Sequence, residues 1–152
     1  MNPFDVLSLC AEIAVAILGF SGVVVVFGGR SQGSTGQPLF RTMFRGTLIP
    51  LALIALAFIL DAASLAEITT WRICSAVHAV ATSLVLYGTL RVAWPTTWAL
   101  RLVRVGGVLV LFLSLLNALV LHAFWPVLAI VIWALGVSLY AFSRLIFSSA
   151  QD

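Results

Sequence analysis

The sequence predicts an all-α integral membrane protein, folded as a bundle of about five transmembrane helices. Hydrophobic residues make up 62% of its 152 positions and charged residues only 9%, and the mean hydropathy is +1.18. Soluble domains carry roughly a quarter charged residues, so this composition excludes a soluble protein. The length suits a single transmembrane domain, which we take to cover residues 1–152.

Five stretches are long enough to span a bilayer, which takes about 20 apolar residues. They run from Phe4 to Gly28, from Leu39 to Ala66, from Trp71 to Val92, from Trp98 to Ala123 and from Pro126 to Phe147. The last two meet at Trp125-Pro126 with almost no linker, which predicts a tight hairpin. The alternative count is four, if one pair merged or one segment lay along the membrane surface.

Glycine and proline mark the boundaries of these stretches. The polar, glycine-rich segment from Gly28 to Gln37 predicts a loop, and Pro38 suits the first turn of the helix that follows. Pro50 falls inside the second stretch, where it removes a backbone hydrogen bond and predicts a bend. Trp94-Pro95 predicts the end of the third stretch.

The beginning of the second stretch is amphipathic. Phe40 and Phe44 are four residues apart, and Arg41 and Arg45 stand beside them in the sequence. A helical turn that is apolar on one side and cationic on the other is typical of the membrane–water interface.

The arginines predict how the bundle is oriented. The chain has eight basic residues, all of them arginine, against five acidic ones. Cytoplasmic loops are enriched in arginine, so we predict that the N-terminus lies outside and the C-terminus in the cytoplasm. Five crossings then leave only Arg72 outside and place seven arginines inside: Arg30, Arg41, Arg45, Arg91, Arg101, Arg104 and Arg144.

The first stretch carries a stripe of small and acidic residues. Each helical residue turns by about 100°, so Glu12 shares one side with Asp5, Gly19 and Gly22. Small residues let helices approach closely in lipid, and we interpret the stripe as a seam, with Gly19 and Gly22 in packing or oligomerisation. Alternatively Glu12 is functional, since ionisable groups inside a membrane usually face an interior or a wet cavity.

The next three stretches each carry a comparable stripe. The stripes are Thr47, Pro50, Ile54, Ala57, Asp61 and Ser64 in the second, Cys74, Ser75, His78, Thr82, Val85 and Thr89 in the third, and Gly107, Ser114 and Asn117 in the fourth. Hydrogen bonds between transmembrane helices contribute about 0.6 kcal/mol each. We therefore predict that Gly107, Ser114 and Asn117 take part in helix packing.

Depth in the membrane distinguishes three of the polar residues. Glu12 and His78 each lie roughly 10 Å from the outer end of their helix, at 1.5 Å per residue, and Asp61 lies nearer that end. A carboxylate and an imidazole in a low dielectric stabilise each other's charged forms or share a proton. Glu12, Asp61, His78 and Thr82 are thus the predicted ion path or gate, and a structural Glu12–His78 hydrogen bond is the alternative.

Metal, cofactor and catalytic chemistry have little support in the sequence. Cys74 and His78 share a helical face, but Cys10 lies opposite Glu12, so no metal or haem site is predicted. No nucleophile has a base beside it, so we predict no enzyme activity. A basic cluster with interleaved aromatic residues is also missing, which argues against nucleic-acid binding. A disulfide between Cys10 and Cys74 is geometrically open.

These observations allow three functional hypotheses. The first is a homo-oligomeric channel or pore-type protein whose polar stripes line or gate an ion path, with acidic rings that favour cations. The second is a structural or accessory subunit that docks on a larger membrane complex without transport of its own. The third is a proton-coupled small-molecule transporter, which usually needs more helices. The expected partners are the lipid bilayer and either a second copy or another membrane protein, in a bacterial inner membrane.

Overall fold

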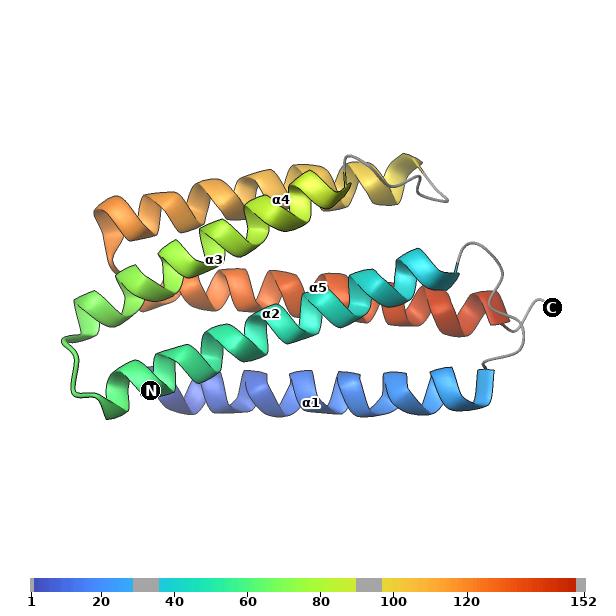
Figure 1. The fold of residues 1–152 in the computed structure, drawn as a ribbon, viewed down its shortest axis with the longest axis horizontal. Coiled ribbons are helices and arrows are strands. Elements are labelled where there is room, and N and C mark those ends of the chain that lie inside the picture. The colour runs from blue at the N-terminus through green and yellow to red at the C-terminus, as the bar shows by residue number, and fades with distance from the viewer. Residues whose placement is uncertain (1, 29–35, 90–96, 150–152) are drawn as a thin grey trace.

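The computed structural model describes residues 2–28, 36–89 and 97–149, which form a bundle of long helices (Figure 1). These are α1 (Pro3–Gly28), α2 (Gly36–Ala62), α3 (Glu67–Thr89), α4 (Thr97–Leu116) and α5 (Phe124–Ser149), with a π-helical turn, η1 (Asn117–Leu121), after α4. Successive helices run in opposite directions along the bundle (Figure 1). Consequently α1, α3 and α5 begin at one end, and α2 and α4 begin at the other.

Four of the described helices are long and apolar enough to cross a membrane. The apolar segments are Pro3–Val23, Phe40–Ala62, Val103–Leu121 and Phe124–Arg144. The remaining helix, α3, is of similar length but carries Arg72, Ser75, His78 and Thr82, which lower its hydropathy. It nevertheless lies along the bundle with the others (Figure 1). The all-α bundle is thus confirmed, with four candidate spans among the described residues, while its inside–outside orientation stays a prediction.

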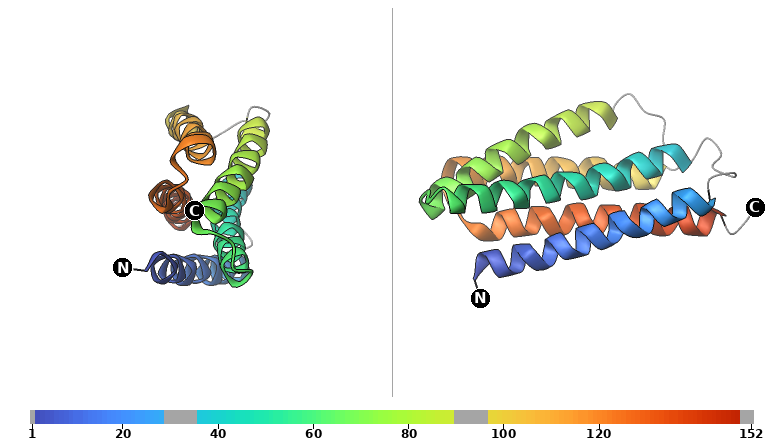
Figure 2. Two further views of the ribbon diagram at one scale, coloured as in Figure 1. Left: turned by 90° about the vertical axis from the view of Figure 1, so that its left-hand side faces the viewer. Right: turned by 60° about the horizontal axis from the view of Figure 1, so that its bottom comes forward.

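The arrangement of the helices follows from one central pair. α2 and α5 pack most extensively against each other, and α1 packs against both of them. α3 and α4 form a second pair, with α3 leaning on α2 and α4 on α5 (Figure 2). Contact between α3 and α5 is slight. The α2–α5 pair and the α3–α4 pair therefore leave space between them along part of their length.

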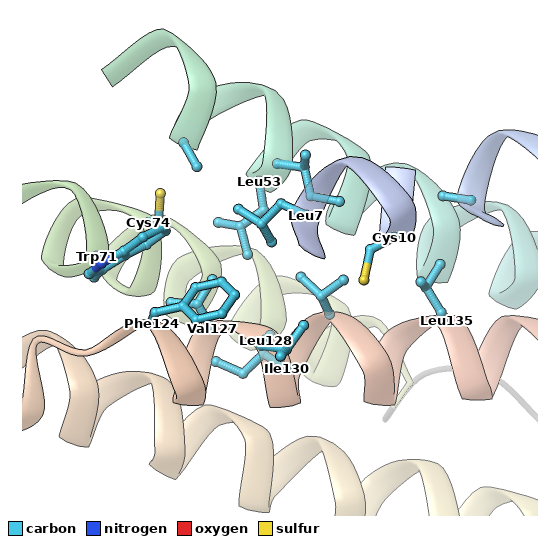
Figure 3. Packing of buried hydrophobic residues seen from close by; sticks show 14 of the residues in the cluster. Leu7, Cys10, Leu53, Trp71, Cys74, Phe124, Val127, Leu128, Ile130 and Leu135 are labelled. Carbon is cyan, nitrogen blue, oxygen red and sulfur yellow. The ribbon is translucent and has the colours of Figure 1, made fainter. Parts of the chain in front are cut away.

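The apolar core lies where α1, α2, α3 and α5 meet. Figure 3 shows Leu7 and Cys10 from α1, Leu53 from α2, Trp71 from α3 and Leu128 from α5 gathered in this region. The face of α1 that contributes to the core has a helical spacing: Leu7, Cys10, Ala14, Ile17 and Ser21 are all buried. Packing in lipid depends on such close contacts, because lipid chains are as apolar as the side chains themselves.

Large apolar side chains also cover the outside of the bundle. Every long helix exposes at least one: Phe20 on α1, Ile59 on α2, Leu84 on α3, Leu109 on α4 and Ile132 on α5. A soluble protein rarely exposes extended apolar surface, whereas a lipid-facing surface requires it. The exterior therefore supports embedding of the bundle in a bilayer.

Two glycines set the closest approaches to α5. A Cβ atom at Gly46 of α2 would overlap Ser138, and one at Gly106 of α4 would overlap the indole of Trp133. The Ser138 hydroxyl donates to the Met43 carbonyl at 3.2 Å, which joins α2 to α5. A side chain at either position would require Ser138 or Trp133 to move.

Several predicted boundaries are wrong by a few residues. The second helix ends at Ala62 rather than Ala66, and Ser64 turns the chain with a left-handed φ of 58°. The fourth helix gives way to η1, and the break comes at His122, whose φ is 49°. Pro126 lies in the first turn of α5, where a missing N–H is tolerated. The helical assignment of α2 continues through Pro50.

Two predicted connections fall outside the described residues. The loop expected from Gly28 to Gln37 falls mainly on residues 29–35, and the stop expected at Trp94-Pro95 falls within residues 90–96. Arg30 and Arg91, which contribute to the predicted orientation, belong to the same two segments.

Candidate functional site

The small and acidic stripe of α1 faces away from the bundle. Glu12, Gly19 and Gly22 are all exposed, and no atom lies within 4 Å of a Cβ built at either glycine. The predicted seam is therefore not used inside the chain. The opposite face of α1, which includes Leu7 and Ile17, packs against α2 and α5 instead.

The structure does not bring the predicted acidic residues to His78. Asp61 is exposed in the last turn of α2, and Glu12 is exposed on α1. His78 is buried, and its hydrogen bonds run to Ser114 and Thr82. A Glu12–His78 hydrogen bond within one chain is thus excluded by the direction in which the two side chains face.

The polar stripe of α3 faces the interior of the bundle. Ser75, His78 and Thr82 are buried, and so are Ser114 and Asn117 opposite them. Gly107 completes the α4 stripe by leaving room for the Leu86 side chain. The stripes of the third and fourth helices therefore face each other.

His78 is held in one orientation by two hydroxyl groups. The Ser114 hydroxyl donates to the Val110 carbonyl at 2.8 Å, so its oxygen accepts from Nδ1–H of His78 at 2.9 Å. This assignment leaves Nε2 as an acceptor for the Thr82 hydroxyl, 3.3 Å away. The imidazole thus has hydrogen-bond partners from its own helix and from α4.

Asn117 forms a bracket at the point where α4 ends. Its Nδ2 donates to Ser75 Oγ at 2.7 Å and to the Ala123 carbonyl at 3.0 Å. Its Oδ1 accepts from the Ala123 backbone N–H at 2.9 Å. The side chain thereby satisfies backbone groups that the π-helical turn and the break at His122 would leave unpaired.

Aromatic rings close the bundle beyond Asn117, toward the end where α1, α3 and α5 begin. The ring of Trp71 lies 5.2 Å from that of Phe124 and 5.7 Å from that of Phe4, measured between centroids. The Trp71 Nε1–H donates to Glu67 at 3.1 Å. We call the layer formed by Ser75, Asn117, Trp71 and Phe124 the separating layer.

On the other side of this layer lies a partly open cavity of about 370 Å³, lined by α2, α3, α4 and α5. It extends from mid-bundle, where His78 and Thr82 line it, to the end where α2 begins, where Arg41 and Arg45 line it. Its walls in between are apolar: Ile49, Val85, Leu86, Val110, Trp133 and Val137. We call it the arginine cavity.

The charges of the arginine cavity have one sign. Arg41 and Arg45 are one helical turn apart, on the same face of α2. Nη1 of Arg45 lies 3.7 Å from where a Cβ of Gly88 would stand, so the guanidinium reaches α3. None of the described residues that line the cavity is acidic. The cavity therefore favours an anion over a cation.

A second hollow opens at the opposite end of the bundle. It has a volume of about 750 Å³ and lies between the beginnings of α1, α3 and α5, with Glu67, His122 and Trp125 on its border. Trp71 and Phe124 belong to its wall. No described residue of the separating layer lines the arginine cavity, whose lining reaches His78 and Thr82 at mid-bundle.

Sequence reasoning missed the part played by Arg41 and Arg45. Their alternation with Phe40 and Phe44 predicted an interfacial turn, and the two phenylalanine rings do stack, with centroids 6.0 Å apart. The cavity itself is a space left between four helices, which no single helix reveals. The available signal was the pairing of cations at i and i+4 with small residues at Gly46 and Gly88.

Metal-binding side chains do not gather in the described residues. No group of three or more His, Cys, Asp or Glu side chains is placed to hold a metal ion there. Cys10 and Cys74 are both buried and free. The disulfide that the sequence left open is therefore not formed.

Fold and site together define a small polytopic membrane protein with four candidate spans. No model of a known protein family matches the chain, and neither does a curated protein or a solved structure. The two hollows and the residues between them are the features that bear on its function.

Proposed function

We propose that the protein is a membrane transport protein that carries anions through its own helical bundle. The observation that supports this most directly is the arginine cavity, which has two guanidinium groups at one end and no acidic side chain among its described lining residues. Guanidinium groups bind anions by charge and by directed N–H groups. Transport differs from simple binding in needing a second opening, and the hollow beyond the separating layer supports one.

This proposal keeps two of the four residues predicted for an ion path. His78 and Thr82 line the arginine cavity, whereas Glu12 and Asp61 are exposed elsewhere. The path then lies within one chain rather than along an oligomer axis. Its basic end favours anions, in place of the cations that an acidic ring would select.

Ion flux into liposomes tests the proposal. Purified protein in liposomes should carry chloride faster than potassium, and the Arg41→Gln, Arg45→Gln double variant should slow chloride flux at least tenfold. Arg144→Gln is the matched control, because Arg144 is an exposed arginine that does not line the cavity. Chloride flux that is absent, or equally fast in both variants, would contradict the proposal.

Glu12→Gln separates the two possible paths. Within one chain Glu12 lies outside the arginine cavity, so chloride flux should be unchanged. A path along an oligomer axis lined by Glu12 would instead lose its cation preference or its rate. An effect of Glu12→Gln on flux would thus favour the oligomeric channel.

The outward face of α1 supports a second candidate, a subunit that associates with another membrane protein or with its own copies. Gly19 and Gly22 on this face have no neighbouring helix packed against them, and Glu12 is exposed on the same face. Docking would cover a carboxyl group that is costly to leave in lipid. Gly19→Leu with Gly22→Leu should then abolish association measured by energy transfer in bilayers, while Gly136→Leu, at an equally open glycine of α5, should not. Association that survives the paired change would rule this face out.

A further inference from the structure

We propose that the arginine cavity binds a single-chain anionic amphiphile, with its carboxylate or phosphate at Arg41 and Arg45 and its apolar chain directed toward His78. This ligand class rests on the proposed function, because it specifies which anion the same cavity accepts. The inference depends on how charge, apolar wall and length are distributed along the cavity.

Charge is confined to one end of the cavity. Arg41 and Arg45 both project from the first turns of α2, and Arg45 reaches across to Gly88 of α3. Both side chains remain exposed, so an anionic headgroup can reach them without losing all of its water. Two guanidinium groups one turn apart suit the oxygen atoms of one carboxylate or phosphate group.

The rest of the wall is mostly apolar and suits a hydrocarbon chain. Between the arginines and His78 the cavity is lined by Ile49, Val85, Val110 and Trp133, among other apolar side chains. His78 and Thr82 at the deep end already bond to each other, and His78 also bonds to Ser114. An apolar chain fills such a space without leaving a polar group unsatisfied.

The dimensions select a chain of medium length. From Arg41 to Ile49 the cavity follows α2 for roughly 12 Å, at 1.5 Å per residue. Its volume of about 370 Å³ holds about a dozen non-hydrogen atoms if each takes about the 30 Å³ of a water molecule. A carboxylate with a chain of about ten carbon atoms fits this space, and a two-chain lipid could place only one chain in it.

Quenching of Trp133 fluorescence gives a direct test. The protein is placed in vesicles of zwitterionic lipid, and bromine-labelled decanoate is added, which quenches tryptophan at close range. We expect saturable quenching that Trp133→Phe removes, because Trp133 lines the cavity. The Arg41→Gln, Arg45→Gln double variant should weaken the affinity at least tenfold, and the control Arg144→Gln should change it less than twofold.

Competition experiments test the chain length and the headgroup charge of the ligand. Unlabelled decanoate should compete with the probe, while acetate and decanol should compete at least tenfold less well. Phosphatidylglycerol included in the vesicles tests the alternative source of the same anionic headgroup: no competition supports a free single-chain amphiphile, whereas competition as strong as that of decanoate would overturn it in favour of a two-chain membrane lipid. Quenching that does not saturate, or that is equal in the double variant and in Arg144→Gln, would overturn the assignment.

The two proposals fail in different ways. If chloride flux depends on Arg41 and Arg45 while decanoate does not bind, the ligand class is wrong and anion transport stands. If decanoate binds and no anion crosses the membrane, the cavity is a binding site and the transport proposal is wrong. Normal elution and helical content of the double variant confirm that it is folded, which exposed arginines lead us to expect.

Discussion

At the scale of single residues, a cluster of buried polar groups lies where α3 meets α4 and η1. Ser75, His78, Ser114 and Asn117 each find a partner on another segment. In the hydrocarbon region of a bilayer, no water is available to hydrogen-bond an unsatisfied polar group. The strength of this network is therefore best tested at Asn117, which makes three of its bonds.

We predict that Asn117→Ala lowers the free energy of unfolding by roughly 2 kcal/mol or more, since it leaves the backbone N–H and C=O of Ala123 without a buried partner. Denaturant titration in detergent micelles measures the change. Ser83→Ala is the control, because this serine is exposed and bonds only within its own helix. Equal stabilities for the two variants would show that the bracket contributes nothing.

Ser64 offers a stabilising substitution. It has a left-handed φ of 58° in the turn after α2, and it is exposed. A left-handed conformation costs a residue with a Cβ roughly 1–2 kcal/mol, so Ser64→Gly should stabilise the fold by about 1 kcal/mol. Ser83→Gly, the same change inside α3, should destabilise it by a similar amount. Opposite signs in one titration series would establish the turn geometry.

At the scale of helices, periodicity predicted which residues share a face but not the direction in which that face points. The stripe with His78 and Thr82 is buried, whereas the stripe with Glu12 and Gly22 is exposed. Both stripes combine small and polar residues at the same helical spacing. Helical periodicity therefore could not distinguish the buried stripe from the exposed one. The two helices differ in which face is buried. The face of α1 with Leu7 and Ile17, opposite its stripe, lies in the core, whereas the face of α3 with Val80 and Leu84, opposite its stripe, is exposed.

Cavities and close approaches between helices were beyond sequence reasoning for a related reason. The arginine cavity exists because α3 and α5 touch only slightly, which depends on the placement of four helices at once. The role of Gly106 likewise depends on Trp133 of α5, whose indole occupies the space that a Cβ would need. The sequence specified the helices and the polar stripe, and the spaces between helices depend on packing.

We predict that Gly106→Ala lowers the free energy of unfolding by roughly 1–3 kcal/mol, because the new methyl group would overlap the indole of Trp133. Gly136→Ala is the matched control on the partner helix α5, where a Cβ meets no atom within 4 Å. It should stabilise the fold by about 0.5–1 kcal/mol, because alanine has the higher helix propensity. If the two variants were equally stable, α4 and α5 would not approach as closely as the structure shows.

At the scale of the whole molecule, the direction of the helices links the fold to its membrane orientation. α1 begins at the end of the bundle opposite to the one where α5 ends (Figure 1). If all five helices cross the bilayer, Pro3 and Ser149 must lie on opposite sides of it. A path across only four apolar segments would place them on the same side. The position of α3, the helix with the buried polar stripe, decides between these cases.

We predict opposite sides, with the C-terminal end in the cytoplasm, because that places Arg41, Arg45, Arg101, Arg104 and Arg144 inside. The arginine cavity would then open to the cytoplasm and the second hollow to the outside. Reporter fusions after Pro3 and Ser149, active only in one compartment each, measure the two locations. A third fusion in the turn after Ala62 provides the control, since it must agree with Ser149 only if α3 does not cross. Matching signals from both ends would contradict five crossings and would remove α3, with His78, from any transmembrane path.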